Sequence, residues 1–194
     1  GLSGYITYYS VTHKQELINN SYNGRQQMLI AQNRRGRILS AKGEVLAQTV
    51  EDEEGNEKRQ YPYQNLFSHA VGYAINGRMG VEAQANYYLI NSSAPLSQKA
   101  GLELAGEKYP GDDVYTTLDV ELQQVASTAL GVYQGAILVT EPDTGKILAM
   151  VSKPDFNPEE IGEMWEELIA DEDSSILLNR VTQGLYPPGS TFKI

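Results

Sequence analysis

The spacing of hydrophobic and polar positions differs between the two halves of the chain. Before about residue 110, short β-prone runs such as 37–39 and 44–46 are separated by turn formers such as Lys42-Gly43. Short runs bounded by such residues are typical of strands joined by tight turns. This half of the sequence therefore predicts an irregular, strand-rich module that contains one or two helices.

A regular helical pattern begins at Asp119. The apolar residues that follow it recur every three or four positions, which places them on one face of a helix. Asp119 is a preferred N-cap residue and Gly131 is a preferred C-terminal stop. We therefore predict a helix over 119–130 with a single apolar face, formed by Leu122, Val125, Ala126, Ala129 and Leu130.

Two apolar runs, 136–139 and 147–151, follow this helix and are joined by residues 141–146. The joining segment contains proline, aspartate and glycine, which supply the chemistry of a turn. The pattern predicts an antiparallel hairpin that is buried on both faces.

A second helix is predicted over 158–170. Asn157 can serve as its cap, Pro158 can occupy the first helical position, and Glu160 can reach back to the cap. The helix has one apolar face, formed by Ile161, Met164, Trp165, Leu168 and Ile169.

Composition and charge narrow the classes of function. Of the 194 residues, 41% are hydrophobic and 21% are charged, which is the balance of a globular protein. A net charge of −10 without a basic stripe argues against nucleic acid as a partner. The absence of cysteine excludes disulfides, a thiolate nucleophile and a cysteine-based zinc site. No apolar run approaches the ~18 residues that a membrane span requires.

The two histidines and the acidic stretch 51–57 are interpreted as structural features rather than as binding sites. His13 and His69 have no histidine or carboxylate partner at a ligand spacing, so we expect surface or capping roles for them and neither a metal nor a cofactor. The acidic stretch 51–57 has no apolar period and contains Gly-Asn, which predicts a solvated hairpin tip rather than a cation site.

Ser190 and Lys193 are the candidate catalytic residues. If a helix begins at Ser190, residues three apart share a face, and the Lys193 amine can reach the Ser190 hydroxyl. A serine hydroxyl is a weak nucleophile and needs such a base. A lysine amine accepts a proton only when it is neutral, which requires burial or a nearby positive charge to depress a pKa of ~10.4. Because Ser-x-x-Lys arises by chance about once in a chain of this length, a helix cap and a solvated lysine remain the alternative on these residues alone.

The surrounding sequence resembles a known family. The run 178–193 is closely similar to the segment around the active-site serine of class B penicillin-binding proteins, and residues 135–152 resemble the family's first transpeptidase strands. Two looser matches, Arg35-Gly36-Arg37-Ile38 and Gly80-Val81-Glu82, resemble motifs of its N-terminal pedestal. Where the family commonly has Asp-Arg-Asn, this chain has Ser40-Ala41-Lys42, so the pedestal salt bridges at those positions cannot be carried over.

The resemblance implies an α+β fold in two parts. Residues 1–110 would form an irregular, strand-rich pedestal or dimerisation-type module, and residues 111–194 would form the first helix, β-hairpin and helix of a penicillin-binding transpeptidase domain. The implied protein is a D,D-transpeptidase that cross-links peptidoglycan stem peptides through an acyl-enzyme at Ser190, with Lys193 as the base. β-Lactams would trap the same serine, and no cofactor or metal is implied.

The resemblance also implies a location and partners. The protein would act on the extracytoplasmic face of the bacterial cell membrane, through an anchor outside this sequence, and residues 1–110 would contact other wall-synthesis proteins. A non-catalytic pedestal or adaptor module and a penicillin-sensing receptor remain alternatives. A free-standing β-lactamase fits less well because of the long upstream module.

The family's active site also needs Ser-x-Asn and Lys-Thr/Ser-Gly motifs after the nucleophile. Neither motif follows Ser190 in this sequence. We therefore expect the chain alone to be inactive and its apolar faces to be partly uncovered. We also expect residues 186–194 to be held by a neighbouring chain, by a swapped copy, or by a separate piece that carries the rest of the catalytic domain.

Overall fold

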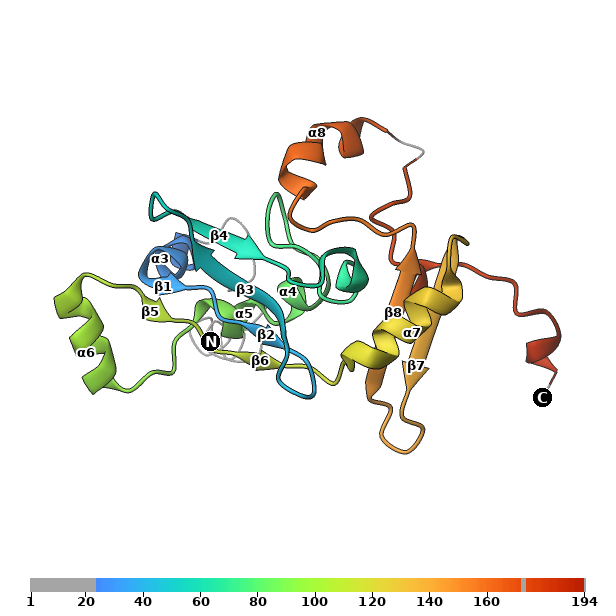
Figure 1. The fold of residues 1–194 in the computed structure, drawn as a ribbon, viewed down its shortest axis with the longest axis horizontal. Coiled ribbons are helices and arrows are strands. Elements are labelled where there is room, and N and C mark those ends of the chain that lie inside the picture. The colour runs from blue at the N-terminus through green and yellow to red at the C-terminus, as the bar shows by residue number, and fades with distance from the viewer. Residues whose placement is uncertain (1–23, 172–173, 194) are drawn as a thin grey trace, which may run out of the picture.

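The computed structural model describes residues 24–171 and 174–193. Figure 1 shows a mixed group of helices and strands at one end and a helix-covered hairpin at the other. The elements of the first group are α3 (Gly24–Gln32), β1 (Asn33–Arg34), β2 (Ile38–Leu39), β3 (Val45–Glu51), β4 (Glu57–Gln60), η1 (Gln64–Phe67), α4 (Gly80–Gln84), α5 (Asn86–Ile90), α6 (Leu96–Ala105), β5 (Tyr109–Pro110) and β6 (Val114–Tyr115). The elements of the second group are α7 (Val120–Leu130), β7 (Gly135–Thr140), β8 (Ile147–Lys153), α8 (Ile161–Ala170), α9 (Arg180–Gln183) and η2 (Gly189–Phe192).

A four-stranded sheet organises the first group, which we call the sheet module (residues 24–118). Its strand order is β4-β3-β2-β6, with β2 and β6 parallel and the other neighbours antiparallel. Strands β1 and β5 form a separate parallel pair. Strands β2 and β3 confirm the runs predicted at 37–39 and 44–46. The core beneath the sheet is formed by Ile38, Leu46, Ala47, Tyr61, Phe67, Ala70, Val71, Ala85, Leu89 and Leu118.

Two glycines of the pedestal-like motifs are required by close backbone approaches. A Cβ on Gly36 would lie 2.0 Å from the carbonyl oxygen of Asp112. Gly80 has a φ of +61°, and a Cβ there would lie 2.5 Å from the carbonyl oxygen of Ala70. Since real Cβ contacts are much longer and a positive φ strains other residues, both positions need glycine.

The predicted acidic hairpin tip is confirmed between β3 and β4. The carboxylate of Asp52 accepts hydrogen bonds from the backbone N–H groups of Glu54 and Asn56, and Gly55 has a φ of +82°. All residues from 51 to 56 are exposed, so the tip is a solvated turn.

The helix predicted from Asp119 is α7. Its N-cap is Asp119, whose side chain accepts a hydrogen bond from the backbone N–H of Leu122 at 3.0 Å, and Gly131 follows its last turn. Of the predicted apolar face, Ala126 is buried while Leu122 and Val125 are exposed. The helix packs through Ala126 and Gln123 instead, which agrees with the expectation that its apolar face would be partly uncovered.

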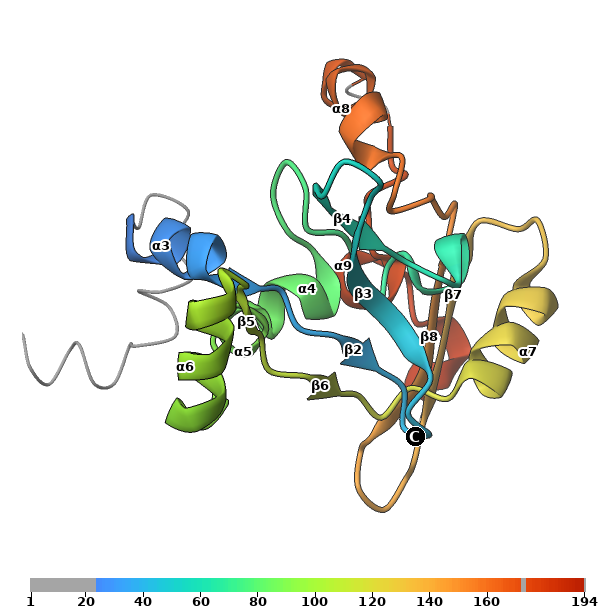
Figure 2. The same cartoon turned by 60° about the vertical axis from the view of Figure 1, so that its left-hand side comes forward.

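Strands β7 and β8 form the predicted antiparallel hairpin, but its burial on both faces was predicted wrongly. Ala149 and Val151 of β8 are buried against Ala126 of α7, whereas Leu138 of β7 is half exposed. Figure 2 shows α7 lying beside the hairpin. In the described part of the chain, the face toward α7 is therefore buried, whereas the opposite face is buried only in part, since Ser152 is covered there but Leu138 is not.

Helix α8 begins at Ile161 rather than at Pro158, which corrects the predicted start. Asn157 caps a preceding turn, because its Oδ1 accepts from the N–H of Glu159 and its Nδ2 donates to Glu160 at 2.7 Å. The side chain of Glu159 is used elsewhere, since it accepts a hydrogen bond from the backbone N–H of Tyr61 at 2.8 Å. This long-range bond holds residues 157–160 as a turn.

The apolar face of α8 is packed for most of its length. Ile161 is fully buried with Tyr73 and Phe156, and Trp165 and Leu168 pack partly against this cluster. Ile169, the last residue of the predicted face, is exposed. In Figure 1, α8 stands away from the rest of the molecule, and this cluster is its attachment.

A buried glutamine joins the sheet module to the hairpin. Gln123 of α7 is fully buried, and its Nε2 donates to the carbonyl oxygens of Leu66 and Met150, each at 2.8 Å. Its Oε1 accepts from the backbone N–H of Met150 at 2.8 Å. The hydrogen bonds of this one side chain thus hold η1, α7 and β8 together.

Among the described residues, no helix has the length and apolar character to cross a membrane.

Candidate active site

The candidate nucleophile lies at the end of a segment that leaves the hairpin after α9. Asn179 caps α9, and the chain then runs outward through Leu185 and Tyr186, whose side chains are exposed, to the short 3-10 turn η2 (Figure 1). Gly189 opens this turn with a φ of +55°, a conformation that favours glycine. Two prolines precede it, at positions 187 and 188.

Ser190 and Lys193 are brought onto this one turn. The backbone N–H of Lys193 donates to the carbonyl oxygen of Ser190 at 3.2 Å, and both side chains are exposed. Among the described residues, no hydrogen bond joins the serine hydroxyl to the lysine amine. The predicted helix at Ser190 is thus a 3-10 turn that starts one residue earlier, and it places the pair close in the chain without forming the catalytic contact.

Ser152 anchors the segment that leads to this turn. Its hydroxyl accepts a hydrogen bond from the backbone N–H of Arg180 at 3.0 Å and donates to the carbonyl oxygen of Leu178 at 3.2 Å. The guanidinium of Arg180 turns back to Ser175, with one bond of 2.8 Å to its hydroxyl. These contacts attach the start of α9 to β8. In the sequence, Ser152 is marked only by its place at the end of the family-like run 135–152.

An ion cluster lies inside the sheet module. Glu82 is fully buried, and its carboxylate accepts from the Nε atoms of Arg35 and Arg59, each at 2.7 Å. Burial alone would raise the pKa of Glu82, but the charges of the two arginines outweigh it and hold the pKa below its usual range. The cluster extends further, since Arg59 donates to the carbonyl oxygen of Gly36 at 2.7 Å and the Tyr61 hydroxyl contacts Glu82. Arg35 and Glu82 each belong to a predicted family motif, but their pairing was not foreseen.

The residues that differ from the family pattern, Ser40-Ala41-Lys42, make contacts of their own. The Ser40 hydroxyl accepts from the backbone N–H groups of Lys42 and Glu44 and so forms the turn between β2 and β3. The amine of Lys42 lies 3.0 Å from the carboxylate of Asp119, the N-cap of α7. This turn therefore makes an ion pair with the second half of the chain.

His69 is buried rather than at the surface, which corrects the role predicted for it. Its Nε2 lies 2.9 Å from the carbonyl oxygen of Pro154, its ring packs edge-on against Phe156, and its Nδ1 is buried without a hydrogen-bond partner among the described residues. Burial lowers the pKa of His69. No group of three histidine, cysteine, aspartate or glutamate residues suited to a metal occurs in the part of the chain that the structure describes. His13 lies outside that part.

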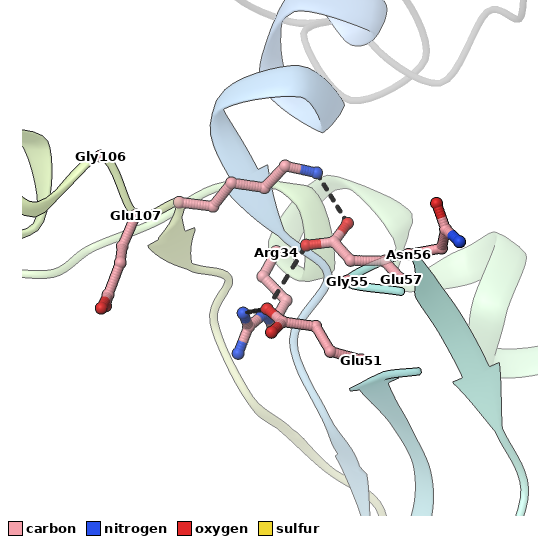
Figure 3. A pocket seen from close by; sticks show the side chains of 8 residues that line it. Arg34, Glu51, Gly55, Asn56, Glu57, Gly106 and Glu107 are labelled. Carbon is pink, nitrogen blue, oxygen red and sulfur yellow. Dashed lines mark hydrogen bonds and ion pairs between the residues drawn. The ribbon is translucent and has the colours of Figure 1, made fainter. Parts of the chain in front are cut away.

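A cavity of about 550 Å³ lies between the β3–β4 tip and the segment after α6 (Figure 3). Its charged groups pair with one another. The Arg34 guanidinium contacts Glu51 and lies 3.6 Å from Glu57, and the amine of Lys108 lies 2.7 Å from Glu57. Because Arg34, Glu51, Glu57 and Lys108 offset one another's charge, we assign no ligand to this cavity.

Comparison with known families accounts for most of the chain. Residues 35–114 match the family described as penicillin binding protein A dimerisation domain, and residues 135–194 match the penicillin binding protein transpeptidase domain. The chain belongs to the class B penicillin-binding proteins. The matched transpeptidase region includes both Ser190 and Lys193.

Curated relatives agree with this family. The chain is 37% identical over 166 residues to the peptidoglycan D,D-transpeptidase MrdA of Acinetobacter baumannii. This match covers 70% of this chain and 25% of that protein. It is 34% identical over 177 residues to the peptidoglycan D,D-transpeptidase PbpA of Mycolicibacterium smegmatis, covering 82% of this chain and 36% of that protein. The chain thus spans between a quarter and a little over a third of the length of these relatives.

Solved structures confirm the predicted α+β fold. The D,D-transpeptidase domain of a peptidoglycan glycosyltransferase from Eggerthella lenta superposes with a TM-score of 0.69 and 38% identity, covering 84% of this chain and 35% of that one. The imipenem acyl-enzyme complex of penicillin-binding protein A from M. tuberculosis gives a TM-score of 0.71 and 30% identity, covering 84% of this chain and 41% of that one.

Proposed function

We propose that the whole protein is a penicillin-binding D,D-transpeptidase that cross-links peptidoglycan stem peptides in bacterial cell-wall synthesis. The observation that carries the proposal is the match of residues 135–194 to the transpeptidase family, with Ser190 and Lys193 on the turn at its end. Relatives named as peptidoglycan D,D-transpeptidases support it. The penicillin G and imipenem acyl-enzyme complexes of the M. tuberculosis relative support a covalent mechanism.

The proposed reaction has two acyl-transfer steps. The Ser190 Oγ attacks the carbonyl carbon of the penultimate D-Ala while the Lys193 Nζ accepts the hydroxyl proton. The peptide C–N bond then breaks, and the terminal D-Ala leaves as an amine that carries that proton. An amine of a second stem peptide attacks the resulting ester, forms the cross-link and restores the serine hydroxyl. A β-lactam would acylate the same oxygen as its ring opens.

The base in this reaction needs an environment that this chain does not supply. A lysine amine must be neutral to accept a proton, and burial or a nearby positive charge favours that state. The Lys193 side chain is exposed, and Ser190 is exposed beside it. We therefore propose that Ser-x-Asn and Lys-Thr/Ser-Gly motifs of the whole protein complete the site around this pair.

Labelling with a fluorescent penicillin tests the proposed nucleophile. The whole protein is expected to form a long-lived fluorescent adduct, and its Ser190→Ala variant is expected to form none, because the attacking oxygen is gone. Thr182→Ala, which removes a nearby hydroxyl of α9, serves as the control and should label like the wild type. Labelling that persists in Ser190→Ala would refute the assignment, and rapid hydrolysis of the adduct would indicate a β-lactamase.

We also propose the domain roles and the location. Residues 1–110 would serve as the pedestal or dimerisation-type module and residues 111–194 as the start of the transpeptidase domain, acting on the extracytoplasmic face of the cell membrane. The strand pairing of β2 with β6 and the contacts of Gln123 support a firm attachment between the two parts.

An interaction role for the pedestal is a second candidate function. Helix α6 has no buried residue, and Leu96 and Leu104 on it are 85% and 92% exposed. The family matched here is itself described as a dimerisation domain. If this helix binds wall-synthesis proteins, Leu96→Glu and Leu104→Glu in the whole protein should abolish their co-purification while penicillin labelling persists. Unchanged co-purification would remove the support for this role.

A further inference from the structure

The side chain of Asn179 forms hydrogen bonds in two directions. Its Oδ1 accepts from the backbone N–H of Val181 at 3.0 Å and so caps α9. Its Nδ2 donates to the carbonyl oxygen of His69, in the sheet module, at 3.3 Å. His69 is itself held, since it is buried and its Nε2 contacts the Pro154 carbonyl. One side chain therefore starts α9 and ties it to the sheet module.

Apolar packing against the sheet module involves Ile176 and Leu177, which lie against the Tyr73 cluster before α9 begins, whereas α9 itself borders a groove. A groove of about 650 Å³ lies between the 69–84 segment and the 177–183 segment. Thr182 and Gln183 of α9 line this groove together with Met79 and Gly80 of the sheet module. On this side α9 faces an open space, and the amide of Asn179 bridges from the start of α9 to the backbone of the sheet module.

The chain between α9 and Ser190 is built to transmit orientation. A Cβ on Gly184 would lie 2.4 Å from the ring of Tyr186 and 2.4 Å from the carbonyl oxygen of Arg180, so this residue lets the ring fold closely against the end of α9. Pro187 and Pro188 follow, and each proline fixes its own φ and restricts the residue before it. The two prolines therefore limit the orientations that the turn bearing Ser190 can take relative to α9.

We propose that Asn179 is a positioning residue for acylation of Ser190. Its amide N–H fixes the nucleophile-bearing segment against the sheet module, and the stiff link from Gly184 to Pro188 carries that position to the serine hydroxyl. The inference rests on the proposed function, since it assigns Asn179 a part in that same acylation step. It also makes the sheet module a direct support of the active site.

An Asn179→Asp variant of the whole protein tests this role. Aspartate is as good an N-cap as asparagine, so α9 keeps its cap, but a carboxylate cannot donate to the His69 carbonyl. The first-order rate constant for acylation by a fluorescent penicillin is expected to fall up to about tenfold, the scale of one lost hydrogen bond. The dissociation constant of the non-covalent penicillin complex should stay unchanged, because the binding groups remain.

Two further variants separate the possible causes. Asn179→Ser keeps a capping hydroxyl, adds no charge and is too short to reach His69, so its acylation should fall as in Asn179→Asp. Asn157→Asp makes the same chemical change at the turn before α8, where the side chain also bonds a backbone N–H and a neighbour, and it should acylate like the wild type.

The outcomes distinguish this inference from the proposed function. A wild-type acylation rate in either folded Asn179 variant overturns the positioning role. An equal loss of acylation rate in Asn157→Asp also overturns it, because replacing an unrelated asparagine amide would then have the same effect. If the wild-type protein itself is not acylated, or if Ser190→Ala is still labelled, the proposed function fails instead.

Discussion

A buried carboxylate is the electrostatic centre of the sheet module. Glu82 forms ion pairs with both Arg35 and Arg59, whose side chains are mostly buried as well. Removing one partner of a buried ion pair leaves an uncompensated charge, whereas an exposed pair contributes little. The stability of this part of the molecule should therefore depend strongly on Glu82 and weakly on surface ion pairs.

Replacing Glu82 with glutamine should destabilise the chain by about 3–5 kcal/mol, because two buried guanidinium groups lose their carboxylate. Urea unfolding followed by circular dichroism measures this loss. Glu51→Gln, at the exposed pair with Arg34, is the matched control and should cost less than about 1 kcal/mol. Equal stability of the two variants would show that the cluster does not support the fold.

His69 should make stability depend on pH. Its pKa is lowered in the folded chain, so the unfolded chain takes up a proton first as the pH falls below about 6.5. Stability from this group is thus present above that pH and is lost below it. Burial outweighs the hydrogen bond to the Pro154 carbonyl and the charge of Asp155, which both raise the pKa of His69, while the charge of Arg180 lowers it further.

The measurement compares the melting temperature of the wild type and of His69→Gln between about pH 7 and pH 5. Glutamine can still donate to the Pro154 carbonyl but does not titrate in this range. The wild type should lose more stability than the variant over this interval. Parallel pH profiles would contradict the assignment of a buried neutral imidazole.

Local chemistry at single residues could be predicted from the sequence, but partners far along the chain could not. The cap by Asp119 depends on the next few residues and was predicted correctly. The bond from Gln123 to Leu66 joins residues 57 positions apart, and that from Arg35 to Glu82 joins residues 47 apart. Which buried polar groups meet is decided by the packing of the whole module, so no local pattern reveals it.

At the scale of elements, α7 connects the sheet module to the β7–β8 hairpin, with one contact at each end of the helix. Its N-cap Asp119 pairs with Lys42 of the β2–β3 turn, and its C-terminal carbonyls accept from Lys153 of β8, with 2.6 Å to the oxygen of Gly131. Cations near the C-terminus of a helix stabilise it. The placement of α7 should therefore be sensitive to its capping residues.

Asp119→Ala should destabilise the chain by about 1 kcal/mol, because the N–H of Leu122 loses its acceptor. Asp119→Asn keeps the capping oxygen and loses only the exposed charge pair with Lys42, so its melting temperature should lie close to that of the wild type. Thermal unfolding of the three proteins measures the difference. An asparagine variant as unstable as the alanine variant would show that the charge, rather than the cap, matters.

The predicted elements differ from the observed ones where a tertiary contact competes with a local one. The start of α8 is delayed because Glu159 bonds the backbone of Tyr61. The face of α7 that packs is set by Gln123, whose polar side chain gave no sign of burial in the sequence. The α7 helix and the β7–β8 hairpin were predicted because their apolar periods and turn residues are local.

At the scale of the whole molecule, the chain has a well-packed sheet module and a more open second half. Leu122, Val125 and Leu138 on α7 and β7 are exposed, as are Val132 and Tyr133 between them. The turn that bears the proposed nucleophile, Ser190, is also exposed. Both features fit a catalytic domain of which this chain supplies the first part.

The chain 1–194 alone should therefore be labelled poorly by penicillin. An isolated turn of this length is not stable in water, since helices shorter than about 12–15 residues are marginal, and Lys193 lacks burial. Labelling of the purified chain and of the whole protein under the same conditions should differ by at least about a hundredfold in rate, the range a general base contributes. Stoichiometric, rapid labelling of the chain alone would contradict this account.

The central claim is that Ser190 is the residue that becomes acylated, and peptide mass spectrometry of the penicillin-treated whole protein tests it most directly. Trypsin cleaves after Arg180 and Lys193, so one peptide, 181–193, contains Ser190 together with two threonines. We predict that this peptide gains the mass of the opened β-lactam and that its fragment ions place the adduct on Ser190. An adduct on Thr182 or Thr191, or on any other peptide, would contradict the account.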